Sequence, residues 1–217
     1  LHLTYISGAV YDLDTHTAGT HVSVVVQGLQ GNDELQGSFT NSADYSETLY
    51  GGGLDDLVVG NGGDDVMYGG NGADILRGGD GDDEIYGGEG SDELYGDGHD
   101  DILHGGDGAD VMMGGPGVDT MYGGPGTDFM AGGDHIDTMY GGSEPDVMCG
   151  DGGADAIYGD DGSDILWGGF PGNGDADVKE GRGGPGNDTC DDNSTAGSNH
   201  SSCETIAASM PRPVNCP

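Results

Sequence analysis

Positively charged side chains are almost absent from this chain of 217 residues, which holds only four lysines and arginines. Arg77 is the only basic residue before Lys179, whereas 41 acidic residues give a formal net charge of -37. Nucleic acids and anionic membrane surfaces are recognised by clustered Lys and Arg, so this balance excludes both as partners. So large a negative charge opposes a compact fold unless a multivalent cation neutralises part of it.

Apolar residues are also scarce: 33% of the chain is hydrophobic and 6% aromatic, while 49 residues are glycine. That composition cannot build a broad hydrophobic core. No apolar run approaches the roughly 18 residues that a membrane-spanning helix needs, so membrane insertion is not expected. The chain begins at Leu1 without a signal-type apolar stretch, and we expect a mature, processed product.

The few cysteines lie late in the chain, at Cys149, Cys190, Cys203 and Cys216. None forms a C-x-x-C pair, so two disulfides are favoured over zinc binding or redox chemistry. Disulfides indicate an oxidising compartment, and we expect a secreted protein, free or associated with a cell surface. We expect a local Cys190–Cys203 disulfide, which leaves Cys149 to pair with Cys216.

A nine-residue repeat fills the chain from Gly51 to Trp167, in thirteen consecutive units without insertion or deletion. Counted from Gly51, position one is always Gly, position six is always Asp, and position eight is always aliphatic or Met. The position-six residues are Asp56, Asp65, Asp74, Asp83, Asp92, Asp101, Asp110, Asp119, Asp128, Asp137, Asp146, Asp155 and Asp164.

Glycines at positions one, two and four allow the positive φ angles of a tight turn, and the last three or four residues favour a short strand. Side chains alternate along a strand, so position eight points inward and positions seven and nine point outward. Two units complete one turn of a flattened coil, and units of equal parity stack at about 4.8 Å. The sequence predicts an all-β parallel β-roll, a two-sheet β-solenoid with a thin core.

Units such as GGNGADILR (69–77) and GGDGDDEIY (78–86) resemble the RTX repeat G-G-x-G-x-D-x-U-x. The resemblance implies Ca²⁺ ions between adjacent turns, held by the position-six Asp carboxylates and by backbone carbonyls. The thirteen units, each with one tight turn, would offer up to about 11 such sites. Folding and calcium binding would then be one event. The invariance of one position argues against the alternative that Asp only forms turns.

Some turns depart from the pattern. The fourth-position Gly is replaced in four units by Leu54, His99, His135 and Glu144. We expect weaker calcium binding there, and we favour His99 and His135 as turn residues over metal ligands. An N-terminal trio, Asp12, Asp14 and His16, is interpreted as a polar loop in preference to a metal site.

The flanking segments divide the chain into three parts. Residues 1–50 are expected to form an N-terminal cap with a strand at 21–26 and degenerate repeats at 28–36 and 42–50, where Glu47 replaces Asp. Residues 51–167 form the regular roll. Residues 168–217 are expected to hold degenerate repeats and a disulfide-stabilised cap, with one restored unit at 183–191 that adds Asp188 as a ligand and places Cys190 inward.

The two outward faces differ. Units of even parity, with Tyr50, place an aromatic residue at each position nine: Tyr50, Tyr68, Tyr86, His104, Tyr122, Tyr140 and Tyr158. Such a ladder either stabilises the strands or forms a recognition surface for a glycan. Units of odd parity carry an apolar strip that predicts an interface: Leu57, Ile75, Val111, Phe129, Val147, Ile165 and Trp167. Either the chain's own termini or a second copy would cover it.

No G-x-S-x-G or H-E-x-x-H motif occurs, and we expect neither catalysis nor a cofactor other than Ca²⁺. The leading hypothesis is an extracellular structural roll that self-associates, through its apolar face or its ends, into a filament, surface layer or matrix. Alternatives are a monomeric adhesive or glycan-binding module, and an export-and-folding module of a secreted protein, as RTX repeats often are. Ice binding is disfavoured because regular outward ranks of Thr are absent.

Overall fold

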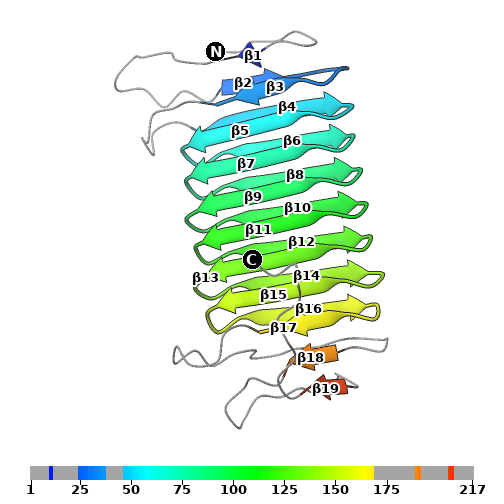
Figure 1. Cartoon of the computed structure of the whole chain (residues 1–217). Helices are drawn as coiled ribbons and strands as arrows, with labels where there is room; N and C mark the ends of the chain where they lie inside the picture. Colours follow the sequence, from blue (N-terminus) through cyan, green and yellow to red (C-terminus); the bar gives the residue numbers. More distant parts are fainter. Residues whose placement is uncertain (1–9, 12–23, 38–45, 169–188, 192–204, 208–217) are drawn as a thin grey trace.

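The computed structural model describes residues 10–11, 24–37, 46–168, 189–191 and 205–207. These residues form two parallel sheets that face each other across a flattened coil (Figure 1). The predicted all-β parallel β-roll is therefore confirmed. No helix long and apolar enough to cross a membrane occurs in the described ranges.

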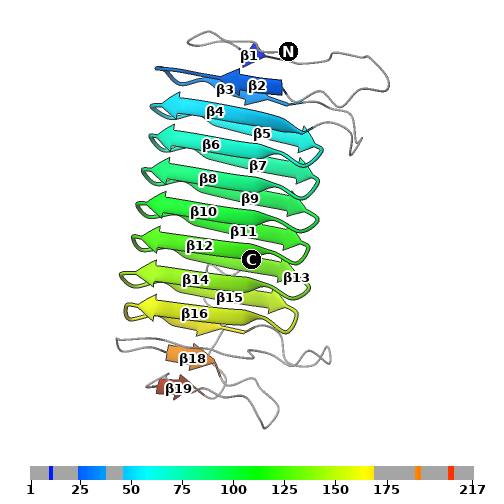
Figure 2. The ribbon, with the colours of Figure 1, turned by 180° about the vertical axis from the view of Figure 1, so that it is seen from behind.

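From β1 to β17 successive strands alternate between the two sheets, which Figure 2 shows from behind, and β18 and β19 continue the sheet that holds β17. In the described ranges, the even sheet holds β2 (Val24–Gln27), β4 (Glu47–Gly53), β6 (Val66–Asn71), β8 (Glu84–Glu89), β10 (Ile102–Asp107), β12 (Thr120–Pro125), β14 (Thr138–Ser143) and β16 (Ala156–Asp161). The odd sheet holds β1 (Val10–Tyr11), β3 (Glu34–Gln36), β5 (Leu57–Gly62), β7 (Ile75–Asp80), β9 (Glu93–Gly98), β11 (Val111–Pro116), β13 (Phe129–Asp134), β15 (Val147–Gly152), β17 (Ile165–Trp167), β18 (Thr189–Asp191) and β19 (Thr205–Ala207). Within the regular array, paired residues such as Met112 and Met130 are two units apart, which confirms two units per turn.

The strands are longer than predicted, because the position-one glycine lies within the strand and is not part of the turn. A typical strand runs from position seven of one unit to position three of the next, as in β6 (Val66–Asn71). Positive φ angles occur at positions two and four, for example 116° at Gly70 and 139° at Gly72, but not at position one. A Cβ added at Gly51 would lie 2.6 Å from Asp56 Oδ2 and 2.7 Å from the Gly69 carbonyl oxygen. Position one is therefore Gly for lack of room, and the prediction of a positive φ there was wrong.

The core is a single file of position-eight side chains, as predicted. These side chains are 0–1% exposed: Val58, Met67, Leu76, Ile85, Leu94, Leu103, Met112, Met121, Met130, Met139, Met148, Ile157 and Leu166. Leu35 and Leu49 continue the file with 0% exposure, which confirms that the degenerate unit at 28–36 and the described part of the unit at 42–50, residues 46–50, belong to the roll. One apolar side chain per nine residues makes the core thin, so the turns must supply additional stabilisation.

The flanking strands extend both sheets. Strand β2 pairs with β4, which confirms the predicted N-terminal strand over Val24–Val26, and residues 21–23 lie outside the described ranges. At the other end, β18 pairs with β17, with Cys190 in register with Leu166. The restored unit therefore stacks on the roll in the predicted register. The domain boundaries remain predictions.

Candidate metal centre

Position-six aspartates form a continuous ladder along both edges of the roll. From Asp56 to Asp146, each backbone N–H donates to Oδ1 of the Asp 18 residues further on, at 2.7–3.0 Å. All thirteen position-six aspartates are 0–3% exposed. Each carboxylate is thereby held between its own turn and the preceding one.

The second carboxylate oxygen has a different environment. For Asp56 and for every position-six Asp from Asp74 to Asp146, Oδ2 is buried and has no hydrogen-bond partner within the described ranges. An ionised carboxylate that is buried without a partner is strongly disfavoured, so a proton or a cation must neutralise it. This repeated oxygen is the feature of the turns that points to a ligand.

Burial raises the pKa of these carboxyl groups. Desolvation is the largest cause, and it raises the pKa of Asp101 and of Asp137 to about 8, although the hydrogen bond from the preceding turn acts in the opposite direction. Neighbouring aspartates raise the pKa of Asp101 further by charge repulsion. Asp83 and Asp128 reach about 7 for the same reasons. In the absence of a cation, these groups therefore take up protons near neutral pH.

The residues present fit a hard divalent cation. Ca²⁺ prefers six to eight oxygen ligands, both carboxylates and backbone carbonyls. Each turn offers one inward carboxylate, and no group of three or more His, Cys, Asp or Glu side chains able to hold a metal occurs in the described ranges. That backbone carbonyls of the turns complete the calcium sites, as the resemblance implies, remains a prediction. The number of ions remains a prediction.

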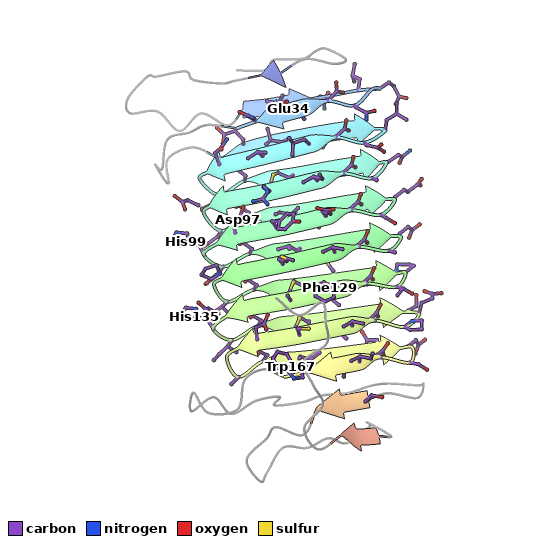
Figure 3. All side chains as sticks on the ribbon, viewed as in Figure 1. Glu34, Asp97, His99, Phe129, His135 and Trp167 are labelled. Atoms are coloured by element: carbon purple, nitrogen blue, oxygen red, sulfur yellow. The ribbon has the colours of Figure 1, made fainter. Side chains whose placement is uncertain are left out.

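The four turns without a fourth-position Gly keep the same backbone shape. Leu54, His99, His135 and Glu144 have φ angles of 72°, 82°, 86° and 69°. These values are consistent with turn residues that tolerate a left-handed conformation. His99 and His135 point outward from one edge (Figure 3), where they line a shallow hollow of about 400 Å³ with Asp80 and Asp100.

Two further residues take part in the ladder, although neither was predicted as a metal ligand. The backbone N–H of Asp33 donates to Asp56 Oδ1 at 2.7 Å, and that of Glu47 donates to Asp65 Oδ1 at 2.7 Å. Asp33 occupies position six of a unit that was recognised as degenerate, so the repeat count already contained this signal. Of the other predicted positions, Asp188, Asp12, Asp14 and His16 lie outside the described residues.

The aromatic ladder on the even sheet is confirmed. Neighbouring rings from Tyr50 to Tyr158, with His104 in the series, have centroids 4.6–5.1 Å apart and planes within 3–8° of parallel. The rings therefore contact each other through their faces. Tyr122 is 38% exposed, the other rings of the ladder are half-buried, and the Tyr86 hydroxyl donates to Glu84 Oε1.

The outward side of the odd sheet is apolar, but a polar belt interrupts it. Arg77 lies 4.3 Å from the centroid of the Tyr95 ring and 3.6 Å from Asp97 Oδ1. Of the predicted interface, Ile75 and Ile165 are 38% and 39% exposed, and Leu57, Val111, Phe129 and Val147 are half-buried. Trp167 is only 3% exposed in the single chain, so its assignment to an interface with another copy is not supported.

A known protein family matches the repeat. The family model described as the RTX calcium-binding nonapeptide repeat (4 copies) matches residues 43–76, 68–103, 77–112, 95–130, 113–148 and 140–170. These matches together cover the regular array and both of its borders. No curated protein matches the chain.

Proposed function

This chain belongs to the RTX calcium-binding nonapeptide repeat family, and we propose that it is an extracellular structural roll whose fold depends on calcium. The observation that carries the proposal is the repeated, buried Oδ2 without a hydrogen-bond partner, from Asp74 to Asp146 among the described turns. A thin core cannot compensate for a whole ladder of buried carboxylates. Calcium supplies the missing positive charge when it is bound.

The chain's own residues perform three tasks in this role. The position-six carboxylates hold successive turns together through Oδ1 and direct Oδ2 to the cation. Position-one glycines leave the room that these carboxylates occupy, as at Gly51 beside Asp56. The position-eight file of Leu, Ile, Val and Met fixes the register between the two sheets.

An extracellular location is supported by the cysteine chemistry. Cys149 is disulfide-bonded, and structural disulfides persist mainly in oxidising compartments. The formal net charge of -37 also requires a medium in which divalent cations are abundant.

Self-association is the second part of the proposal. Apolar side chains such as Leu57 and Ile75 face outward from the odd sheet, and Ile75 is 38% exposed. Contiguous apolar patches on soluble proteins commonly mark interaction sites. A second copy stacked on this face, or on the open ends of the sheets, would generate the filament, layer or matrix.

The alternatives are less well supported. A glycan platform needs free aromatic faces, whereas the rings of the even-sheet ladder lie against each other. The repeat is a structural calcium-binding fold, and we propose no enzymatic role for it.

The experiment is calcium removal followed by two independent measurements. Dialysis against a chelator at neutral pH should abolish the parallel-sheet circular dichroism, and added Ca²⁺ should restore it. Light scattering in calcium should give a mass above that of one chain if the roll self-associates. An unchanged spectrum without calcium would overturn the calcium proposal, and a monomeric mass at all accessible concentrations would overturn self-association.

A further inference from the structure

One column of outward side chains on the odd sheet is buried. Ala131, Cys149 and Trp167 occupy position nine of β13, β15 and β17, and their exposed fractions are 3%, 0% and 3%. Elsewhere in this column, Val59 and Tyr95 are half-buried and Arg77 is exposed. Outward side chains face the solvent unless another segment lies over them. Met113 and Phe129 of the same sheet pack against this cluster, but the large Trp167 stands at the end of the column, near β17 in Figure 3, and its burial indicates that a further segment of the chain lies over it.

Cys149 identifies that segment, because it is disulfide-bonded. Cα atoms joined by a disulfide are usually 4.4–6.8 Å apart, or roughly 7 Å at most. Cys190 pairs in register with Leu166, and Leu166 pairs with Met148, the neighbour of Cys149. Two strand spacings therefore separate Cys190 from Cys149, which is about 10 Å. The backbone register excludes Cys190 as the partner.

Cys203 is excluded by the same register. Thr205 pairs with Thr189, Thr189 with Ile165, and Ile165 with Val147, so Thr205 lies three strand spacings from Val147. Since Cys149 is two residues beyond Val147, Thr205 and Cys149 are about 16 Å apart. Two residues span at most about 7 Å, which leaves Cys203 about 9 Å or more from Cys149. That separation exceeds the disulfide limit.

Cys216 remains, and its position in the chain fits. Ala207 pairs with Asp191, which continues the column of Trp167 and Cys149. The distance from Ala207 to Cys149 along this column is about 14 Å. Cys216 is nine positions beyond Ala207, and this length of chain can span about 30 Å. The direct route runs back along the column, over Trp167.

We propose that Cys149 and Cys216 form a disulfide that straps residues 208–217 across the odd sheet, over the apolar column of Ala131, Cys149 and Trp167. Cys190 and Cys203 are then left to each other. The strap closes the C-terminal part of the odd sheet to a second copy. This last statement rests on the proposed self-association, which would then use the part of the strip around Leu57 and Ile75.

Two variants with one cysteine removed test the strap, because Trp167 is the only tryptophan of the chain. In calcium, Cys216→Ser should free Cys149 for thiol labelling, shift the Trp167 emission to longer wavelength and increase its quenching by acrylamide. Cys203→Ser is the matched control and should leave Trp167 shielded. Circular dichroism in calcium checks that both variants keep the roll, and reduction of the unmodified protein with a small thiol should reproduce the Cys216→Ser result without any mutation.

Peptide mapping without reduction decides the connectivity separately. It should recover Cys149 joined to Cys216, and a link from Cys149 to Cys190 or Cys203 would overturn the strap. Unchanged quenching of Trp167 in Cys216→Ser would also overturn it. These readouts do not depend on particle mass, so a monomeric protein would defeat the proposed self-association while leaving the strap intact.

Discussion

The backbone N–H of Asp92 donates a hydrogen bond of 2.8 Å to Oδ1 of Asp110, one turn further along the roll. Asp110 repeats the relationship by donating to Asp128 Oδ1 at 2.9 Å. The two oxygens of Asp110 therefore differ, because Oδ1 closes the preceding turn and Oδ2 is buried without a hydrogen-bond partner, which leaves it available to the proposed cation. Asparagine in place of Asp110 keeps a side-chain oxygen that can accept the hydrogen bond, but it carries no negative charge. A comparison of Asn and Ala at this position therefore separates the hydrogen bond from the charge.

Replacement of Asp110 should give two different losses. Asp110→Asn keeps a neutral acceptor for the N–H of Asp92, whereas Asp110→Ala removes it and costs a further ~0.5–1.5 kcal/mol, as for other hydrogen bonds between neutral groups. Both variants should bind less calcium, as measured by titration calorimetry. Denaturant unfolding in saturating calcium should then rank the unmodified protein above Asp110→Asn, and Asp110→Asn above Asp110→Ala. Equal stability of the two variants would show that the Oδ1 hydrogen bond contributes nothing.

The metal-free roll should become more stable as the pH falls. Burial raises the pKa of Asp101 and of Asp137 to about 8 in the folded chain, while unfolded Asp titrates near 3.9. The folded state therefore holds more protons between about pH 4 and pH 8, so its stability is greatest at the acid end and is lost as the pH rises. Circular dichroism of protein freed of calcium should show the sheet at about pH 5 and little of it at about pH 8.

Calcium provides the control for this pH dependence. When the cation neutralises the carboxylates, the protein should stay folded across the same range, and binding near neutral pH should release protons. Metal-free protein that is equally folded at both ends of the range would contradict the assignment of the buried carboxylates as the destabilising groups.

Two glycines of β9 should differ sharply in their tolerance of alanine. A Cβ at Gly96 would meet Asp101 Oδ2 and lie 2.7 Å from the Gly114 carbonyl oxygen, whereas the nearest atom to a Cβ at Gly98 is 3.6 Å away. Gly96→Ala should therefore separate adjacent turns and cost a few kcal/mol, on the order of 1–3, as in other overpacked sites. Gly98→Ala should stay within about 0.5 kcal/mol. Thermal unfolding in calcium compares them, and equal melting temperatures would refute the steric role of position one.

The repeat made much of the fold predictable from sequence. A period of nine assigns the whole file of core side chains from Val58 to Leu166, since each unit places its eighth residue in the same environment. The role of Gly51 was not predictable, because its restriction comes from Gly69, two units away, and not from its own φ angle. The burial of Trp167 was not predictable either, because the repeat gives an outward position no signal of the segment that covers it.

A charge added to the outward face of the odd sheet should affect association more than the same charge on the even sheet. Ile75 on the odd sheet and Ile102 on the even sheet both occupy position seven and are 38% and 41% exposed. Changing either to Asp adds the same charge to the same chain and leaves the position-eight core untouched, so both variants should fold in calcium. If a second copy packs on the odd sheet, Ile75→Asp loses a buried apolar side chain worth ~1.5–3 kcal/mol and should weaken association by roughly 10-fold to 100-fold.

Sedimentation in calcium over a range of concentrations measures this effect. Ile102→Asp adds the same charge but removes no apolar side chain from the proposed interface, so it should associate like the unmodified protein. Dissociation of Ile102→Asp with no change in Ile75→Asp would move the interface to the even sheet and its tyrosine ladder. Equal dissociation of both variants would mean that the added charge, and not the apolar strip, controls assembly. If all three proteins have the mass of one chain, no second copy packs on the strip around Ile75, and the proposed self-association is wrong.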